Sequence, residues 1–427
     1  MTDTDYQALA RISRAFRPTA PIDSELLFAG RKAQMVNLLD VALQPGQHAI
    51  IWGTRGVGKT SLAKVMGTVL GRTDSTTSTF YTCNKNDTFD SIWRSILEDI
   101  SLNFDMLPPG FNSQIVEGNV SSLDLIGRFL TNPDGTVRSL TPDDVRRALM
   151  QSSGETSRLI IIDEFDRVES EETRQLIADT VKTLSDQGVN ATLFLVGVAD
   201  SVDQLIEQHP SIQRCLAQVH MPPMSIDELA EIIERGMKIA ELNFEEEFRG
   251  DVVRLAHGLP NYVHMLGMSA ARATVEDNRD TVLRTDLKAA IVKSVELVDE
   301  SITSAYHKAT DSNRDTLYRA VLLACALARR DQRDTFSAMD VRDQLVTVTG
   351  KYRDIPAFAQ HLKDFSGTGD RGGILDRTGS QRNFRYRFRD PLLPPYVLMH
   401  GHIDHSNGAT RLPLWVEVST TAKKPRA

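Results

Sequence analysis

The sequence predicts an α/β protein with a mostly parallel sheet, followed by helical segments toward its C-terminus. Three observations support this fold class. Short apolar runs alternate with helix-like segments between about residues 23 and 221, and strands that are separated by helices pair in parallel. A glycine-rich turn joins the first of these runs to a helix-like segment. After a Pro-Pro dipeptide at 222–223, apolar residues recur with helical periodicity instead.

Length and composition limit the possible classes of protein. The chain has 427 residues, 41% of them hydrophobic, and a formal net charge of −8, so we expect two or three domains. The negative charge excludes a polycation, and any contact with nucleic acid must come from a local basic patch. The three cysteines are far apart and lack metal spacing, which indicates buried thiols in a reducing compartment. The polar N-terminus and the lack of a long apolar run predict a soluble cytoplasmic protein without a membrane span.

The first domain is expected at residues 23–223, after an N-terminal basic arm at 1–22. Arginines 11, 14 and 17 recur at helical spacing in this arm, which favours a solvated helix face over a binding site. The candidate strands are His48–Trp52, Thr79–Cys83, Leu159–Ile162, Thr192–Val196 and Gln218–Met221. The candidate helices are Ser61–Leu70, Thr88–Ile100, Ser122–Leu130 and Pro142–Gln151, with irregular insertions at 106–120 and 132–140.

Two further domains are expected beyond Pro223. Three amphipathic segments predict a helical lid at residues 224–300, namely Ile226–Ala240, Glu246–Ala256 and Tyr262–Val275. Residues 301–400 contain three more helix-like segments and a hairpin-like segment at 373–389, which together predict a winged helix. These helices lie near Ser312–Arg329, Ala338–Val346 and Ile355–Phe365. Residues 401–427 are expected to form a disordered tail.

The glycine-rich turn matches the phosphate-binding pattern G-x-x-x-x-G-K-[ST] at every fixed position. Glycines allow backbone N–H groups to turn toward a polyphosphate, and the N-terminus of the following helix adds a partial positive charge. Lys59 is expected to reach the β- and γ-phosphates, and the Thr60 hydroxyl to contact Mg²⁺. The turn therefore predicts a polyphosphate ligand and Mg²⁺. The residues expected around the nucleotide are Gly53, Thr54, Arg55, Gly56, Val57, Gly58, Lys59, Thr60 and Ser61.

A second signal is a run of four apolar residues, 159–162, that ends in Asp163 and Glu164. Ligands bind at the carboxyl edge of parallel sheets, where these two carboxylates would lie. Asp163 is expected to hold Mg²⁺ through water, and Glu164 to polarise the water that attacks the γ-phosphate. An acidic turn at a strand end is the alternative, but the upstream phosphate-binding turn favours the catalytic interpretation.

With these two motifs and the order of αβ core, helical lid and winged helix, the chain resembles the AAA+ and STAND-type P-loop ATPases over roughly residues 23–400. The archaeal-type ATPases and the origin-recognition initiators are the branches that it resembles most. The resemblance implies an ASCE-type core and an enzyme that hydrolyses ATP. It also implies that ATP and Mg²⁺ lie between core and lid, and that exchange of ATP for ADP repositions the lid and the winged helix.

The resemblance implies roles for further residues in the core. Gly30 and Arg31 correspond to a segment that packs near the adenine. Asp200 ends a segment, Thr192–Asp200, that is similar to the family's sensor strand, where a polar residue orients the attacking water. A helix N-cap is the alternative for Asp200. Arg214 corresponds to the arginine finger, which reaches the γ-phosphate of a neighbouring subunit, and a surface ion pair is the alternative.

In the lid, Pro260 ends a Gly-Leu-Pro sequence that is similar to the Gly-x-Pro motif of STAND proteins. The resemblance implies that this proline contacts the base or the ribose, and a simple turn between lid helices is the alternative. Asn261 and Tyr262 stand where initiator-type relatives have a sensor arginine. This departure favours a nucleotide-gated switch over an initiator.

The segment 384–389 alternates aromatic residues with arginines. On a strand, this pattern places the aromatic side chains on one face and the guanidinium groups on the other, where they would suit phosphate contacts. The alternative is a solvated wing whose aromatic residues pack on the domain core and whose arginines pair with acidic neighbours. The candidate nucleic-acid residues are Arg377, Arg382, Arg385, Arg387 and Arg389.

Two classes of function therefore stay open. The first is a DNA-associated ATPase, such as an initiator, a loader, a transposition regulator or a defence component. The second is a STAND-like signalling switch that assembles protein partners without binding DNA. Both imply ATP and ADP as ligands, and a homo-oligomer or a partner protein as the working assembly.

Overall fold

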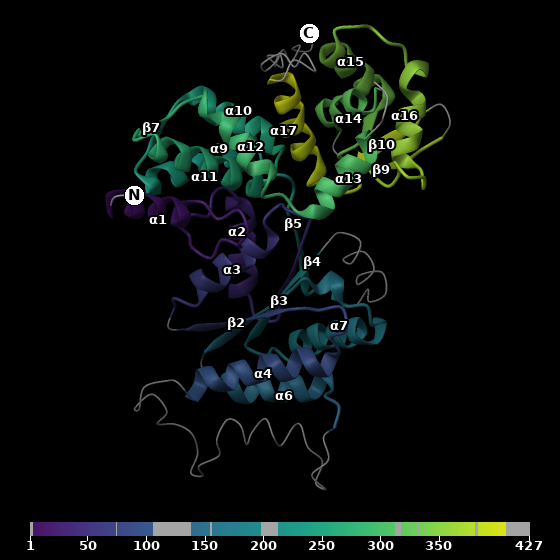
Figure 1. Ribbon diagram of the computed structural model, residues 1–427. Coiled ribbons are helices and arrows are strands. Elements are labelled where there is room, and N and C mark those ends of the chain that lie inside the picture. The colour runs from purple at the N-terminus through teal and green to yellow at the C-terminus, as the bar shows by residue number, and fades with distance from the viewer. Residues whose placement is uncertain are drawn as a thin grey trace, which may run out of the picture. The chain divides into compact units, whose positions relative to one another are not determined.

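The computed structural model describes residues 3–73, 75–105, 138–153, 156–197, 212–311, 317–331, 333–380 and 383–406 (Figure 1). Asp200, Arg382, the helix expected at 122–130 and the insertion expected at 106–120 lie outside these residues. The chain divides into two compact units. Residues 20–223 form one unit, and residues 1–19 together with 224–427 form the other. The segments expected as lid and winged helix thus belong to one unit, together with the start of the chain.

Five parallel strands form the central sheet of the first unit, in the order β2-β3-β4-β1-β5 (Figure 1). This sheet confirms the predicted α/β fold class. The order places β4 between β1, which leads into the glycine-rich turn, and β3, which ends in Asp163. The strands are β1 His48–Trp52, β2 Thr76–Thr82, β3 Ser157–Asp163, β4 Ala191–Gly197 and β5 Leu216–His220.

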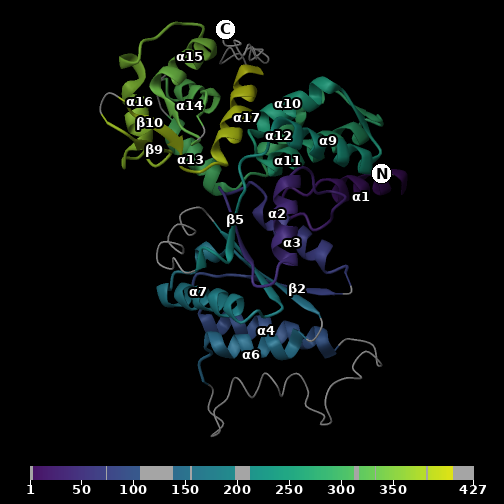
Figure 2. The same cartoon turned by 180° about the vertical axis from the view of Figure 1, so that it is seen from behind.

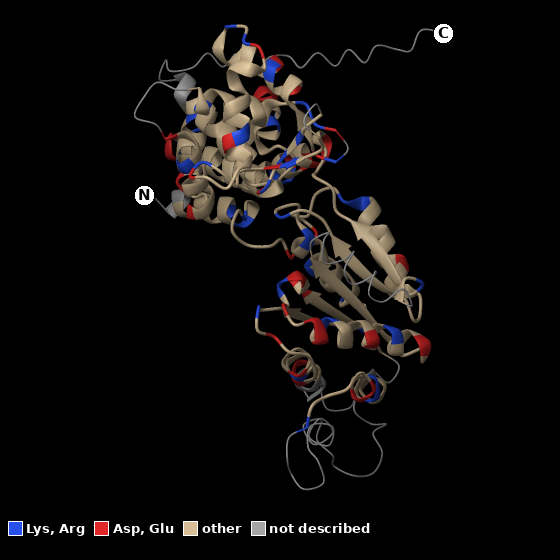
Figure 3. Cartoon of the chain, turned by 90° about the vertical axis from the view of Figure 1, so that its right-hand side faces the viewer, with Lys and Arg blue, Asp and Glu red and all other residues tan. Residues whose placement is uncertain are grey.

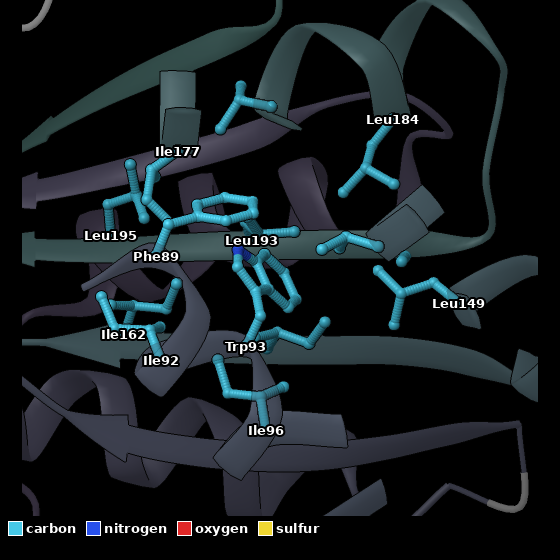
Figure 4. Packing of buried hydrophobic residues seen from close by; sticks show 14 of the residues in the cluster. Phe89, Ile92, Trp93, Ile96, Leu149, Ile162, Ile177, Leu184, Leu193 and Leu195 are labelled. Atoms are coloured by element: carbon cyan, nitrogen blue, oxygen red, sulfur yellow. The ribbon is translucent and has the colours of Figure 1, made fainter. Parts of the chain in front are cut away.

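Helices cover both faces of this sheet, and for this reason its three central strands, β1, β3 and β4, are almost fully buried. On β3, Ile160 and Ile162 point into a cluster with α4, α6 and α7, where Trp93 lies among Phe89, Ile96 and Leu193 (Figure 4). Ile161 points to the opposite face, where a Cβ on Gly67 of α3 would lie 3.1 Å from its Cδ1 atom. The helices are α2 Lys32–Leu43, α3 Lys59–Leu70, α4 Phe89–Asp105, α6 Pro142–Ser153 and α7 Glu171–Asp186, with a 3-10 turn, η1, at Phe165–Arg167.

The second unit begins with helix α1, Asp3–Ala15, and continues after Pro223 with α9 Ile226–Ala240, α10 Glu246–Ala256, α11 Pro260–Glu276 and α12 Asp286–Val295. Helix α1 is not a free arm, because its apolar side packs on α9 and α11. The Phe16 ring just after it is 1% exposed and lies against Gly236 and Gly267. A Cβ at either glycine would come within 2.5 Å of the ring. Two short strands, β6 Asn243–Phe244 and β7 Thr281–Val282, pair beside these helices.

The C-terminal part of the second unit contains helices and a three-stranded antiparallel sheet of order β8-β10-β9. The hairpin expected at 373–389 corresponds to β9 and β10, whereas the winged helix as a domain type stays a prediction. The elements are α13 Glu300–Thr310, α14 Tyr318–Leu327, β8 Phe336–Ser337, α15 Ala338–Thr349, α16 Pro356–Ser366, β9 Leu375–Thr378, β10 Arg385–Phe388 and α17 Leu393–Ser406.

The prediction that the tail begins at residue 401 is wrong for its first six residues, which complete α17. This helix packs against α12 and α14 (Figure 2) and buries Tyr396, Val397 and Met399. Because the helix is apolar on several sides, its sequence lacks the amphipathic period by which a surface helix is detected. Among the described residues, no helix has both the length and the apolar character that a bilayer span requires.

Candidate functional site

The glycine-rich turn has the geometry of a phosphate-binding loop. It leaves β1 at Trp52 and enters α3 at Lys59, with Gly56 and Gly58 at φ values of 86° and 94°. Only glycine adopts this backbone region without strain. Gly53 is required for a different reason, because a Cβ there would lie 2.3 Å from the main-chain oxygen of Met221. The loop therefore presents backbone, and not side chains, before the N-terminus of α3.

Lys59 lies over this loop. Its Nζ donates hydrogen bonds to the carbonyl oxygens of Gly53 and Thr54 at 2.9 and 3.0 Å. Desolvation lowers the pKa of Lys59, while the nearby carboxylates Asp166, Asp163 and Glu164 partly oppose this effect. A partly desolvated ammonium group gains from an anionic ligand. The position of Lys59 at the start of α3 therefore fits a polyphosphate.

Asp163 and Thr60 come together at the carboxyl edge of the sheet. The Thr60 hydroxyl donates to the Asp163 carboxylate, and the Glu164 N–H donates to its Oδ1 at 2.9 Å. Asp163 is 3% exposed, and this burial raises its pKa. A hydroxyl and a carboxylate beside a phosphate loop are the protein ligands that Mg²⁺ takes when phosphate oxygens and water complete its shell.

A metal site built from protein groups alone is not found in the part of the chain that the structure describes. No group of three or more His, Cys, Asp or Glu side chains there is arranged to hold an ion. The donor set of Thr60 and Asp163 thus fits Mg²⁺ that arrives with a nucleotide, because Mg²⁺ commonly uses one or two protein ligands in such sites.

Glu164 is held by a neighbouring arginine. Its Oε2 accepts a hydrogen bond from Arg167 at 2.6 Å, and both side chains are about half exposed. The Glu164 backbone has φ 52°, which is uncommon for a residue with a side chain and recurs at functional sites. An exposed ion pair of this kind contributes about 0–1 kcal/mol, so thermal motion opens it readily. Sequence reasoning missed Arg167, because only its partner distinguishes it from other surface arginines.

The Arg31 side chain lies between the phosphate-binding loop and the segment that follows β5. Its guanidinium is buried and donates from Nη2 to the carbonyl oxygens of Val57 and Pro222, at 3.0 and 2.7 Å. Gly30 precedes it with φ 65°. The Ser61 hydroxyl accepts a hydrogen bond on Oγ from the Ile22 N–H at 3.1 Å, and the nucleotide contact expected of Ser61 stays a prediction. The adenine contacts that the resemblance implied for Gly30 and Arg31 stay predictions.

Arg214 lies at the opposite edge of the sheet from Lys59. It precedes β5, and its carbonyl oxygen accepts from Gln47 Nε2 at 3.2 Å, just before the start of β1. Its side chain pairs with Asp186 and is largely exposed. A strand of five residues separates the two edges by about 15 Å. Arg214 thus cannot serve the loop of its own subunit, and its role toward a neighbouring subunit stays a prediction.

Pro260 is the first residue of α11 and belongs to the second unit. The turn before it has two left-handed residues, His257 and Gly258, at φ 51° and 86°. The Gly258 carbonyl accepts a hydrogen bond from the Met224 N–H at 2.8 Å. The turn interpretation accounts for this geometry, and a nucleotide contact of Pro260 stays a prediction.

The arginines of the hairpin have acidic or aromatic partners. Tyr386 and Phe388 of β10 are buried, as the alternating pattern predicts. Arg385 pairs with Asp331 at 2.8 Å and donates to Thr335. Arg387 and Arg389 approach Asp376 at 3.7 and 3.1 Å, and Arg377 lies over the Phe384 ring.

This arrangement matches the alternative of a solvated wing, in which aromatic residues pack inward and arginines pair with neighbouring acids. Basic and acidic residues are also interspersed along the helices in Figure 3. The nucleic-acid role of the hairpin arginines therefore stays a prediction.

The sequence matches the family model "Novel STAND NTPase 1" over residues 14–364. Among solved structures, the Walker-type ATPase paby2304 of Pyrococcus abyssi is similar, with 17% identity, a TM-score of 0.54, and coverage of 89% of this chain and 98% of the other. The ORC2 protein of Aeropyrum pernix, in its ADPNP-ADP complexes, gives 15% identity, a TM-score of 0.47, and coverage of 93% and 98%. No curated protein matches the sequence.

Proposed function

Because the chain belongs to the novel STAND NTPase 1 family, we propose that it binds and hydrolyses ATP with Mg²⁺ and uses the nucleotide state to switch its conformation. Family membership confirms the prediction of a P-loop NTPase enzyme. The observation that carries the proposal is the meeting of Lys59, Thr60 and Asp163 at one edge of the sheet. This edge is where ligands bind in open α/β folds.

Different groups of the site would bind the phosphates, hold Mg²⁺ and activate water. Backbone N–H groups of the loop and the N-terminus of α3 would hold the phosphates, and Lys59 would bind their outer oxygens. Thr60 and Asp163 would hold Mg²⁺, which neutralises phosphate charge when it is bound. Glu164 would accept a hydrogen bond from the attacking water once its bond to Arg167 opens. Each role uses a group whose position is set by β1, β3 or α3.

We further propose that the output is assembly with protein partners or with other copies of the chain. The paired arginines of the hairpin and the net charge of −8 support this choice over DNA. In such an assembly, Arg214 would act on the nucleotide of a neighbouring subunit. Its exposure and its weak surface ion pair leave it able to change partners.

DNA association is the second candidate. The side chains of Arg387 and Arg389 are 52% and 58% exposed, and they share one acidic partner, Asp376. Because exposed pairs contribute about 0–1 kcal/mol, DNA phosphates could replace this carboxylate. DNA binding that weakens with salt and is lost on changing both arginines to alanine would favour this candidate. Arg72→Ala is the control, because it removes an exposed ion pair with Glu25 in the first unit, far from the hairpin in the sequence.

The catalytic proposal is tested with Lys59→Ala and Glu164→Gln. The first change should abolish ATP binding in calorimetry, because it removes the cation of the phosphate loop. The second should retain ATP but lower turnover by about 10²-fold or more, since it removes the group that polarises water. Glu169→Gln is the matched control, because Glu169 is exposed and pairs only with Lys85 among the ion pairs described. Unchanged affinity in the first variant, or wild-type turnover in the second, would refute the assignment.

A further inference from the structure

The segment that leaves the first unit packs against the base of the phosphate loop. Strand β5 ends at His220, whose ring stacks on Trp52 with centroids 4.2 Å apart. The Met221 N–H donates to the Trp52 carbonyl at 2.7 Å. Gly53 approaches Met221 so closely that no side chain fits between them. The exit segment and the first residue of the loop therefore cannot move independently.

Arg31 adds a second connection between the same two segments. A single nitrogen, Nη2, donates to the Val57 carbonyl inside the loop and to the Pro222 carbonyl in the exit segment. Arg31 is 2% exposed, and its backbone has φ 58°. A side chain is held in this backbone region only where its surroundings favour it strongly. Because one nitrogen serves both carbonyls, a displacement of Val57 changes the hydrogen bond to Pro222.

The link that follows is short and stiff. Pro222 and Pro223 each have a restricted φ, and the second unit begins at Met224. Within that unit, the Met224 N–H donates to the Gly258 carbonyl, and a capping box of Ser225 and Glu228 starts α9 directly afterward. Each end of the Pro222–Met224 link is thus held by a hydrogen bond within its own unit.

We propose that Arg31 is a positioning residue that transmits the nucleotide state from the phosphate loop to the Pro222–Met224 link, and so to the orientation of the second unit. The inference rests on the proposed nucleotide-driven switch. Arg31 acts here through two main-chain carbonyls, and no contact with nucleotide is needed. Nucleotide that reorders the loop at Val57 would shift the direction in which the chain leaves at Pro222.

The test compares two buried arginines of the first unit. Arg31→Met keeps most of the apolar stem and removes every donor. Arg158→Met is the matched control, because Arg158 is also buried and donates to a main-chain carbonyl, that of Ser152. Arg158 differs in lying at the start of β3, at the edge of the sheet opposite to the phosphate loop. Both changes leave a carbonyl without its guanidinium donor, so a general loss of stability affects both.

The readout is the distance between two spin labels, measured without nucleotide and with saturating ATP and Mg²⁺. The labels are attached at Lys182→Cys in α7 and Glu247→Cys in α10, both at exposed positions in different units. Cys83, Cys215 and Cys325 are buried and should not react. ATP affinity is measured by calorimetry in every variant, so that a lost distance change is not confused with lost binding.

We expect the label distance to change with ATP in the wild type and in Arg158→Met, and to lose more than half of this change in Arg31→Met at saturating ATP. Arg31→Lys, which can reach one carbonyl, should restore part of the change and decides the question if Arg31→Met does not fold. If the Arg31 variants show the full change in label distance with ATP, the role of Arg31 is overturned, while the proposed switch stands. No change in the wild type would refute the proposed switch, and the coupling with it.

Discussion

Replacing Gly53 by alanine should disable the nucleotide site while the protein remains folded. The added Cβ would lie 2.3 Å from the Met221 carbonyl oxygen and 3.1 Å from the Met221 Cβ. Real Cβ atoms do not approach other atoms closer than 3.0 Å. The obstacle is main chain, so a rotamer change cannot relieve it. The loop and the exit segment must therefore separate by about 0.7 Å or more.

The size of this shift sets the expected effect. A displacement of about 1 Å in a positioning group can reduce catalysis by about 10²-fold. We therefore expect kcat/KM for ATP to fall by about 10²-fold, which corresponds to about 2.7 kcal/mol of transition-state stabilisation. Overpacking of this kind should also lower the free energy of unfolding by about 1–3 kcal/mol.

The assay measures steady-state ATP turnover and thermal unfolding in parallel, with Gly188→Ala as the control. Gly188 follows α7 with φ 59°, and nothing lies within 4 Å of an added Cβ. Alanine there costs about 1–2 kcal/mol of backbone strain, but it should leave turnover unchanged. Turnover of Gly53→Ala within threefold of the wild type would refute the reasoning, because the loop would then tolerate a displacement from Met221.

Two further predictions concern buried groups. Asp163→Asn should raise the melting temperature without nucleotide by about 1–4 °C near neutral pH, while abolishing Mg²⁺-dependent turnover. Burial raises the pKa of Asp163, so the folded wild type loses stability as pH rises through that pKa. The higher melting temperature of the variant should therefore disappear in acid. A difference in melting temperature that does not depend on pH would contradict this explanation. Phe16→Ala should speed amide hydrogen exchange in α1 by 10²-fold or more, because a buried Phe→Ala change costs about 3–5 kcal/mol. Exposed Tyr6→Ala is its control, and unchanged exchange in both variants would show that Phe16 does not hold α1.

The phosphate loop and the acidic strand end could be located from the sequence alone. Their chemistry depends on contiguous residues, since Gly58, Lys59 and Thr60 lie at fixed spacing between a strand and a helix. Asp163 follows an apolar run, and the carboxyl ends of parallel strands always meet at one edge. This local information was sufficient to predict the parallel sheet and the P-loop class of enzyme. The Mg²⁺ contacts expected of Thr60 and Asp163 stay predictions.

Other features depended on residues that are distant in the sequence, and only the tertiary structure decided them. Arginines 31, 385 and 387 look alike in the sequence, yet one is buried on two carbonyls and the others pair with carboxylates. The sequence places Phe16 in the predicted basic arm. In the structure, its ring is buried against Gly236 and Gly267, where a larger side chain would not fit. The partner of a long side chain is determined by packing between distant segments, and the spacing of residues along the sequence does not predict that packing.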